Sequence, residues 1–109
     1  MLCALTARRL KPGTFERFRE VFLRHETLEN PPEGYMRFNM IRNTEGPDEA
    51  VCFGFFDGTV DELRRTAAEQ GYAEQLEAIA PFVDSVGADG LYEIVEEWTA
   101  PPRAVGLTA

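Results

Sequence analysis

The chain has 109 residues, of which 44% are hydrophobic and 28% charged, as is typical of one globular domain with its own core. The formal net charge of −8 argues against a nucleic-acid partner or an anionic membrane surface. No apolar run approaches the ~20 residues that cross a bilayer. Two cysteines are too few for a disulfide framework, and no secretory leader precedes the first predicted strand, so we expect a cytoplasmic protein.

Hydrophobic periodicity predicts strands where apolar residues alternate and helices where they recur every three to four residues. The predicted strands cover residues 2–8, 35–43, 50–56 and 91–99, and the predicted helices cover 15–28, 60–70 and 72–83. Thr59 and Glu62 form a capping box at the start of the second helix, and Gly71 supplies its left-handed stop. Residues 87–90, Gly-Ala-Asp-Gly, are expected to turn the chain before the last strand.

The order strand, helix, strand, strand, helix, strand fits a doubled split β-α-β unit, the ferredoxin-like α+β fold with an antiparallel sheet and helices on one face. Residues 1–99 then form one domain, and residues 100–109 form an extended C-terminal tail. The first and third strands are apolar on both faces, whereas the second and fourth each have a polar face. This pattern places the first and third strands at the centre of the sheet.

Helices can cover only one face of such a sheet, so something else must cover the other. Phenylalanine side chains facing water would be costly. A second copy related by a two-fold axis would bury them, which predicts a homodimer through the sheet faces. A monomer with an exposed sheet face is the alternative.

Three segments carry a resemblance to a known family: KPGTFERFREVF (residues 11–22), GYMRFNMIRN (34–43) and AEQLEAIAPFVDSV (73–86). Together with the last strand, they resemble the antibiotic biosynthesis monooxygenase-like domains of the dimeric α/β barrel superfamily over nearly the whole chain. The resemblance implies a barrel of two chains. In some relatives it also implies a cofactor-free oxidation in which an electron-rich phenolate substrate itself reduces oxygen.

The residues show no metal cluster, nucleophile elbow, phosphate loop or dinucleotide fingerprint, so we expect no metal and no cofactor. The candidate catalytic side chains are His25, Asn39 and Tyr72, because an imidazole can move a proton near neutral pH and an amide or phenol can orient a carbonyl or phenolate. The candidate substrate-binding side chains are Phe22, Phe38 and Trp98. Each candidate also has a purely structural interpretation. His25 would favour the end of its helix, Asn39 would face solvent, and Tyr72 would anchor its helix. The remaining aromatic residues would pack in the core or at the dimer interface.

Two functions from different classes follow. The first is a monooxygenase, an oxidoreductase that acts without a cofactor on a small aromatic or polycyclic substrate in a pocket between helices and sheet. The second is a non-catalytic dimer that binds a small ligand or a protein partner. The resemblance also implies a third possibility, the haem degradation known for other relatives. The residues that those enzymes use are not visible here, because the first strand has no asparagine and His25 lies on the first helix.

Overall fold

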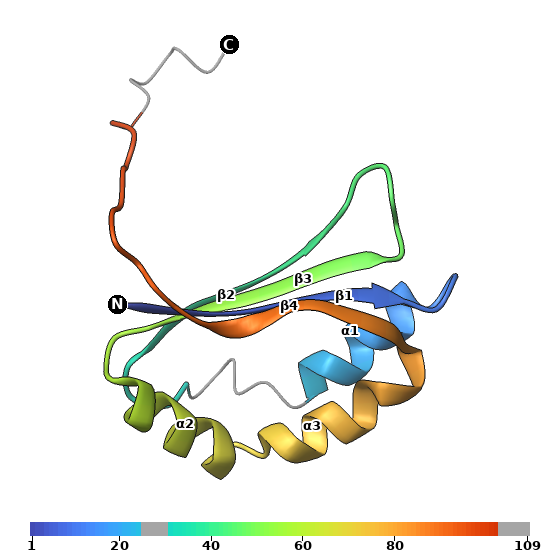
Figure 1. Ribbon diagram of the computed structural model, residues 1–109, viewed down its shortest axis with the longest axis horizontal. Helices are drawn as coiled ribbons and strands as arrows, with labels where there is room; N and C mark the ends of the chain where they lie inside the picture. The colour runs from blue at the N-terminus through green and yellow to red at the C-terminus, as the bar shows by residue number, and fades with distance from the viewer. Residues whose placement is uncertain (25–30, 103–109) are drawn as a thin grey trace.

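A computed structural model describes residues 1–24 and 31–102, and it contains a four-stranded sheet of order β2-β3-β1-β4. The elements are β1 (Leu2–Leu10), α1 (Phe15–Arg24), β2 (Tyr35–Arg42), β3 (Glu49–Phe56), α2 (Val60–Glu69), α3 (Tyr72–Ile79), a 3-10 turn (Ala80–Phe82) and β4 (Val83–Glu93). All neighbouring strands are antiparallel. The three helices lie on one side of the sheet (Figure 1). The predicted ferredoxin-like α+β fold, with β1 and β3 at its centre, is confirmed.

The last strand begins at Val83, and the predicted turn over residues 87–90 is wrong. β4 runs antiparallel to β1 as far as Glu93, so this glycine-containing stretch lies inside the strand. The pairing shifts register between Thr6 and Arg8 of β1, where β4 has one residue more than its partner. Glycine in a strand interior often marks such a bulge, and the sequence pattern that predicts a turn therefore also suits a bulged strand.

β4 also ends before the predicted strand does. Glu93 pairs with Leu2, the first residue of β1, and the amide of Ile94 donates to the carbonyl of Met1 at 3.0 Å. Residues 94–102 have no neighbouring strand and leave the sheet on the side away from the helices (Figure 1). Trp98 therefore lies outside the sheet and is 86% exposed.

α2 begins as its capping box predicts. The Thr59 hydroxyl accepts a hydrogen bond from the Glu62 amide at 3.1 Å, and the Glu62 carboxylate accepts one from the Thr59 amide at 3.2 Å. Gly71, with φ of 78°, separates α2 from α3, because glycine adopts the left-handed region without steric cost. The helical segment after it ends earlier than predicted, since Pro81 lies in the 3-10 turn and β4 follows directly.

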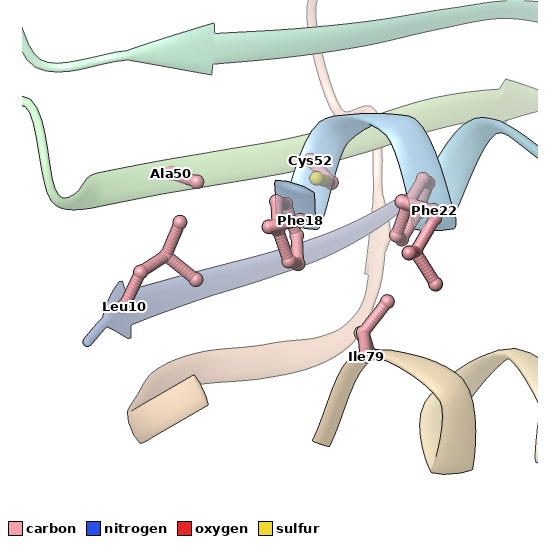
Figure 2. Packing of buried hydrophobic residues seen from close by; sticks show 7 residues of the cluster. Leu10, Phe18, Phe22, Ala50, Cys52 and Ile79 are labelled. Atoms are coloured by element: carbon pink, nitrogen blue, oxygen red, sulfur yellow. The ribbon is translucent and has the colours of Figure 1, made fainter. Parts of the chain in front are cut away.

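The core lies between the sheet and the helices α1 and α3 (Figure 2). Its buried members come from β1, β3 and these two helices: Leu10, Phe18, Val21, Phe22, Ala50, Cys52 and Ile79. Burying each large apolar side chain stabilises the fold by about 1.5–3 kcal/mol. α2 contributes no buried residue. The helix-facing side of the sheet is thus well packed beneath α1 and the end of α3, but not beneath α2 and the start of α3.

The other side of the sheet carries no helix (Figure 1). Its central strands present half-buried apolar side chains, and the edge strands add Ile41 and Tyr92, which are 49% and 47% exposed. We call this surface the open face; strand pairing assigns to it Leu5, Ile41, Val51, Phe53, Phe55 and Tyr92. The central strands thus carry apolar side chains on both faces, although β1 also carries Arg8 on the helix-facing side and Arg9 on the open face. In the described residues, no helix is both long and apolar enough to cross a membrane.

Candidate functional site

A cavity of about 550 Å³ lies between the helix-facing side of the sheet and the helices α2 and α3. Small-molecule sites typically measure about 300–1,000 Å³. Its wall is mainly apolar and includes Phe22, Phe38, Cys52, Phe56, Leu63, Leu76 and Leu91. The space exists because α2 spans this part of the sheet without inserting a buried side chain.

A bulge in β2 places Tyr35 in the cavity wall. The register with β3 shifts between Tyr35 and Arg37, so Met36 has no partner across the ladder and is 60% exposed. Simple alternation would put Tyr35 and Arg37 on the same face. Instead the Tyr35 ring lies over Gly54, where an added Cβ would come within 3.3 Å of the Tyr35 Oη. The missing side chain at Gly54 therefore leaves room for the tyrosine ring.

Polar side chains gather in the cavity wall where β1, β4 and α3 meet. Thr6 and Arg8 come from β1, Asp89 from β4 and Tyr72 from the first residue of α3. The Thr6 hydroxyl donates to Asp89 Oδ1 at 3.1 Å, which holds the carboxylate beside the neighbouring strand. The wall therefore combines a long apolar surface with a small polar end.

Arg8 is the most buried charged group of this polar end. Its side chain is 5% exposed, and its Cζ lies 5.8 and 5.7 Å from the ring centroids of Phe18 and Phe22. Its Nη1 is buried and has no hydrogen-bond partner in the described part of the chain. Nearby, the amide of Gln75 donates to the carbonyl of Phe22 at 3.1 Å and ties α3 to α1.

Tyr72 keeps its phenolic proton more firmly than an ordinary tyrosine. Burial raises the pKa of Tyr72 above its usual value, and the negative charge of Asp89 raises it further. The positive charge of Arg8 and a hydrogen bond with Thr6 act in the opposite direction but are smaller. Tyr72 is therefore a neutral hydrogen-bond donor at physiological pH.

Three of the predicted site residues line the cavity: Phe22, Phe38 and Tyr72. Asn39 does not, because it pairs with Phe53 and lies on the side of the sheet away from the helices. Its Oδ1 is buried without a hydrogen-bond partner among the residues described. Trp98 lies beyond β4 and outside the cavity wall, and His25 lies outside the described residues.

Most of the cavity wall was not predicted, and Arg8, Tyr35 and Asp89 are the missed residues that matter most for its chemistry. Arg8 continues the alternation of Leu2, Ala4 and Thr6, so a charge on an otherwise weakly polar strand face is the signal that could have revealed it. Asp89 was missed because residues 87–90 were predicted to form a turn and not part of a strand. Tyr35 was hidden by the bulge, which reverses the face that simple alternation assigns to it.

No protein-family model matches the sequence, and no curated protein matches it significantly. Solved structures do match. A candidate antibiotic biosynthesis monooxygenase from Deinococcus radiodurans aligns with TM-score 0.75 and 12% identity over 94% of this chain and 100% of its own. SnoaB, a cofactor-independent oxygenase from Streptomyces nogalater, aligns in a single-site variant with TM-score 0.73 and 18% identity over 88% and 94%.

Rv0793 from Mycobacterium tuberculosis aligns with TM-score 0.72 and 13% identity over 90% of this chain and 98% of its own. These identities are low, and the likeness lies in the arrangement of helices and strands. The chain has the ferredoxin-like fold of antibiotic biosynthesis monooxygenase proteins over most of its length.

Proposed function

We propose that the protein is a monooxygenase-like enzyme that oxidises a small aromatic substrate in the cavity without a bound cofactor. The observation that carries this proposal is the cavity itself, whose apolar wall suits a flat ring and whose polar end offers a donor and a carboxylate. SnoaB, which shares the fold, is described as a cofactor-independent oxygenase. This likeness supports the same reaction class here.

In such a reaction the substrate supplies all the electrons. A phenol with a free ring position opposite its hydroxyl reacts with one O₂ to give a quinone and one water. The ring carbon loses its hydrogen and gains one oxygen atom, the hydroxyl loses its proton, and the second oxygen atom leaves as water. The phenolate is the form that reduces oxygen, so a site for this chemistry must favour loss of the phenol proton.

Two groups of the cavity suit these roles. The Asp89 carboxylate accepts one hydrogen bond from Thr6 and can take the phenol proton with its remaining lone pairs. The neutral Tyr72 hydroxyl can donate to the oxygen on which negative charge develops. The Asp89 and Tyr72 side chains are both exposed, Tyr72 by 37%, so the substrate ring itself must displace water from them.

The test is oxygen uptake with a panel of naphthols and related polycyclic phenols, using protein freed of metal with a chelator. We expect one O₂ consumed per phenol, at a rate proportional to protein. Leu76→Trp should block the reaction by filling the cavity, whereas Val60→Trp, at an exposed position outside the cavity wall, should not.

Absence of oxygen uptake across the panel would contradict the proposal. If the same phenols stabilised the protein without being consumed, the cavity would belong to a binding protein, which is the function that the same geometry supports without catalysis.

We also propose that a second copy of the chain covers the open face. The support is the apolar side chains that the central strands and Ile41 and Tyr92 of the edge strands present on this surface, together with the edge-to-face pair of Phe53 and Phe55, whose ring centroids are 5.9 Å apart. A two-fold axis would set this surface against itself and remove it from water. It would also offer the buried Asn39 Oδ1 a donor from the partner subunit.

A further inference from the structure

The cavity wall differs in charge from the rest of the chain. The protein carries a formal net charge of −8. Among the described residues that line the cavity, the charged groups are two arginines, Arg8 and Arg64, and one carboxylate, Asp89. The wall is therefore net positive inside a strongly acidic protein, which is the distribution expected where an anion must be attracted locally.

Arg8 differs from the arginines that form ion pairs. Arg9, Arg19, Arg24 and Arg42 each lie within 4 Å of a glutamate oxygen, and all four are exposed. Arg8 is buried and forms no ion pair among the described residues. The nearby Asp89 is bound instead by the Thr6 hydroxyl.

The aromatic rings beside Arg8 compensate its charge only partly. Phe18 and Phe22 lie at cation–π distances, but a ring attracts a guanidinium less strongly than a carboxylate does. A buried cation without a counter-charge is unfavourable for folding. An anionic ligand bound beside Arg8 would supply the negative charge that compensates the guanidinium.

We infer that the cavity binds an organic anion, a flat aromatic body bearing one acidic group that is ionised at neutral pH, with the anionic oxygen atoms on the Arg8 guanidinium. The planar guanidinium matches the two oxygen atoms of a carboxylate or of an ionised hydroxyquinone. Phe22 and Phe38 stack at 5.5 Å with an interplanar angle of 18° and offer a wall for the ring. The inference rests on the proposed function only in making this anion the substrate, since binding needs no turnover.

The probes are naphthoate, which is an anion, and naphthamide, its neutral counterpart of nearly the same shape. Calorimetric titration of the native protein should show tighter binding of naphthoate. Arg8→Met should weaken naphthoate binding on the order of 10- to 100-fold, as expected for hydrogen bonds to a charged group, and should leave naphthamide binding within about threefold. Arg9→Met is the matched control, because it removes an exposed arginine of the same strand, and it should change neither affinity.

A stability measurement distinguishes a binding role from a structural one. Arg8→Met replaces a buried charge that has no ion-pair partner in the described part of the chain with an apolar side chain, so the ligand-free variant should unfold at the same temperature as the native protein or higher. A clear loss of stability would indicate that Arg8 holds the fold together and would count against the inference. Arg8→Lys keeps the charge but loses the planar donors, so it should recover only part of the naphthoate affinity.

Hydroxynaphthoquinone, added as the ionised form, separates an enolate-type anion from a carboxylate, and Arg8-dependent binding of either probe supports the inference. Equal affinity of the native protein for naphthoate and naphthamide, together with hydroxynaphthoquinone binding that does not depend on Arg8, would overturn it. Oxygen uptake with neutral phenols but no preference for anions would overturn this inference and leave the proposed function standing. Arg8-dependent anion binding without oxygen uptake by any phenol would contradict the proposed function and leave this inference standing.

Discussion

Tyr72 shows how one residue acquires a chemical role from its surroundings. As the first residue of α3, it stands over the cross-strand pair of Thr6 and Asp89, and burial together with the Asp89 charge raises its pKa. A phenol with a raised pKa is a weaker acid that stays protonated at neutral pH, so it remains able to donate a hydrogen bond. In the proposed reaction, Tyr72 would therefore act as a neutral donor to the substrate oxygen after the Asp89 carboxylate has taken up the phenol proton.

Tyr72→Phe should lower the rate of phenol oxidation by about tenfold or more, because the variant lacks the donor to the substrate oxygen. Tyr92→Phe, on the open face, is the control and should retain the native rate. The part of the native rate that depends on the Tyr72 proton should hold through neutral pH and decline only above pH 10, the ordinary value that its pKa exceeds. Oxygen uptake measured across pH checks this, and a decline already at neutral pH would contradict it.

At the scale of elements, α2 forms one wall of the cavity and packs only loosely against the rest of the chain. It has no buried residue, and the capping box of Thr59 and Glu62 satisfies amides at its first turn. Hydrogen bonds from the Thr59 side chain and backbone lower the pKa of Glu62. The stability from this interaction is thus present above the ordinary Glu pKa of 4.5 and is lost as pH falls through the lower folded value.

Thr59→Ala should lower the free energy of unfolding by about 1 kcal/mol at neutral pH, the usual effect of removing an N-cap hydroxyl. Because the variant lacks the bonds that favour ionised Glu62, it should lose less stability than the native protein on acidification below pH 4.5. Urea unfolding at several pH values measures both effects. Thr44→Ala, at an exposed loop position, should match the native protein, and equal acid sensitivity of Thr59→Ala and native protein would refute the argument.

At the scale of the whole molecule, the two faces of the sheet have different tasks. The helix-facing side combines the core beneath α1 and α3 with the cavity beneath α2. The open face carries apolar side chains on its central strands, with Arg37 and Asn39 at the β2 edge, yet it has no helix (Figure 1). Phe55 is partly covered by Arg37, whose Cζ lies 4.7 Å from the ring centroid, while Ile41 and Tyr92 remain about half exposed.

Phe53→Glu should convert the proposed dimer to single chains, because it places a charge at the centre of the buried surface. Sedimentation of the native protein and the variant at micromolar concentration measures the change. Val60→Glu adds the same charge at an exposed position of α2 and should leave the assembly intact. Sedimentation of the native protein as single chains would show that the open face has no second copy against it.

Much of this architecture is readable from residues close together in the chain. The apolar character of β1 and β3, the Thr59–Glu62 cap and Gly71 are local signals, and they specify the order of the elements and the central position of two strands. Tyr72, Phe22 and Phe38 could also be proposed as site residues, because aromatic residues on helix and strand faces point between layers.

The remaining features depend on strand pairing, which local sequence does not encode. Register with β1 decided that residues 87–90 continue a strand, and it thereby brought Asp89 beside Thr6. The β2 bulge places Tyr35 in the cavity wall. Because β1 begins at Leu2, β4 has no strand to pair with beyond Glu93, and Trp98 lies outside the sheet. Only the packed structure shows that Arg8 is buried and forms no ion pair within residues 1–24 and 31–102, because burial and ion pairing depend on residues distant in the chain.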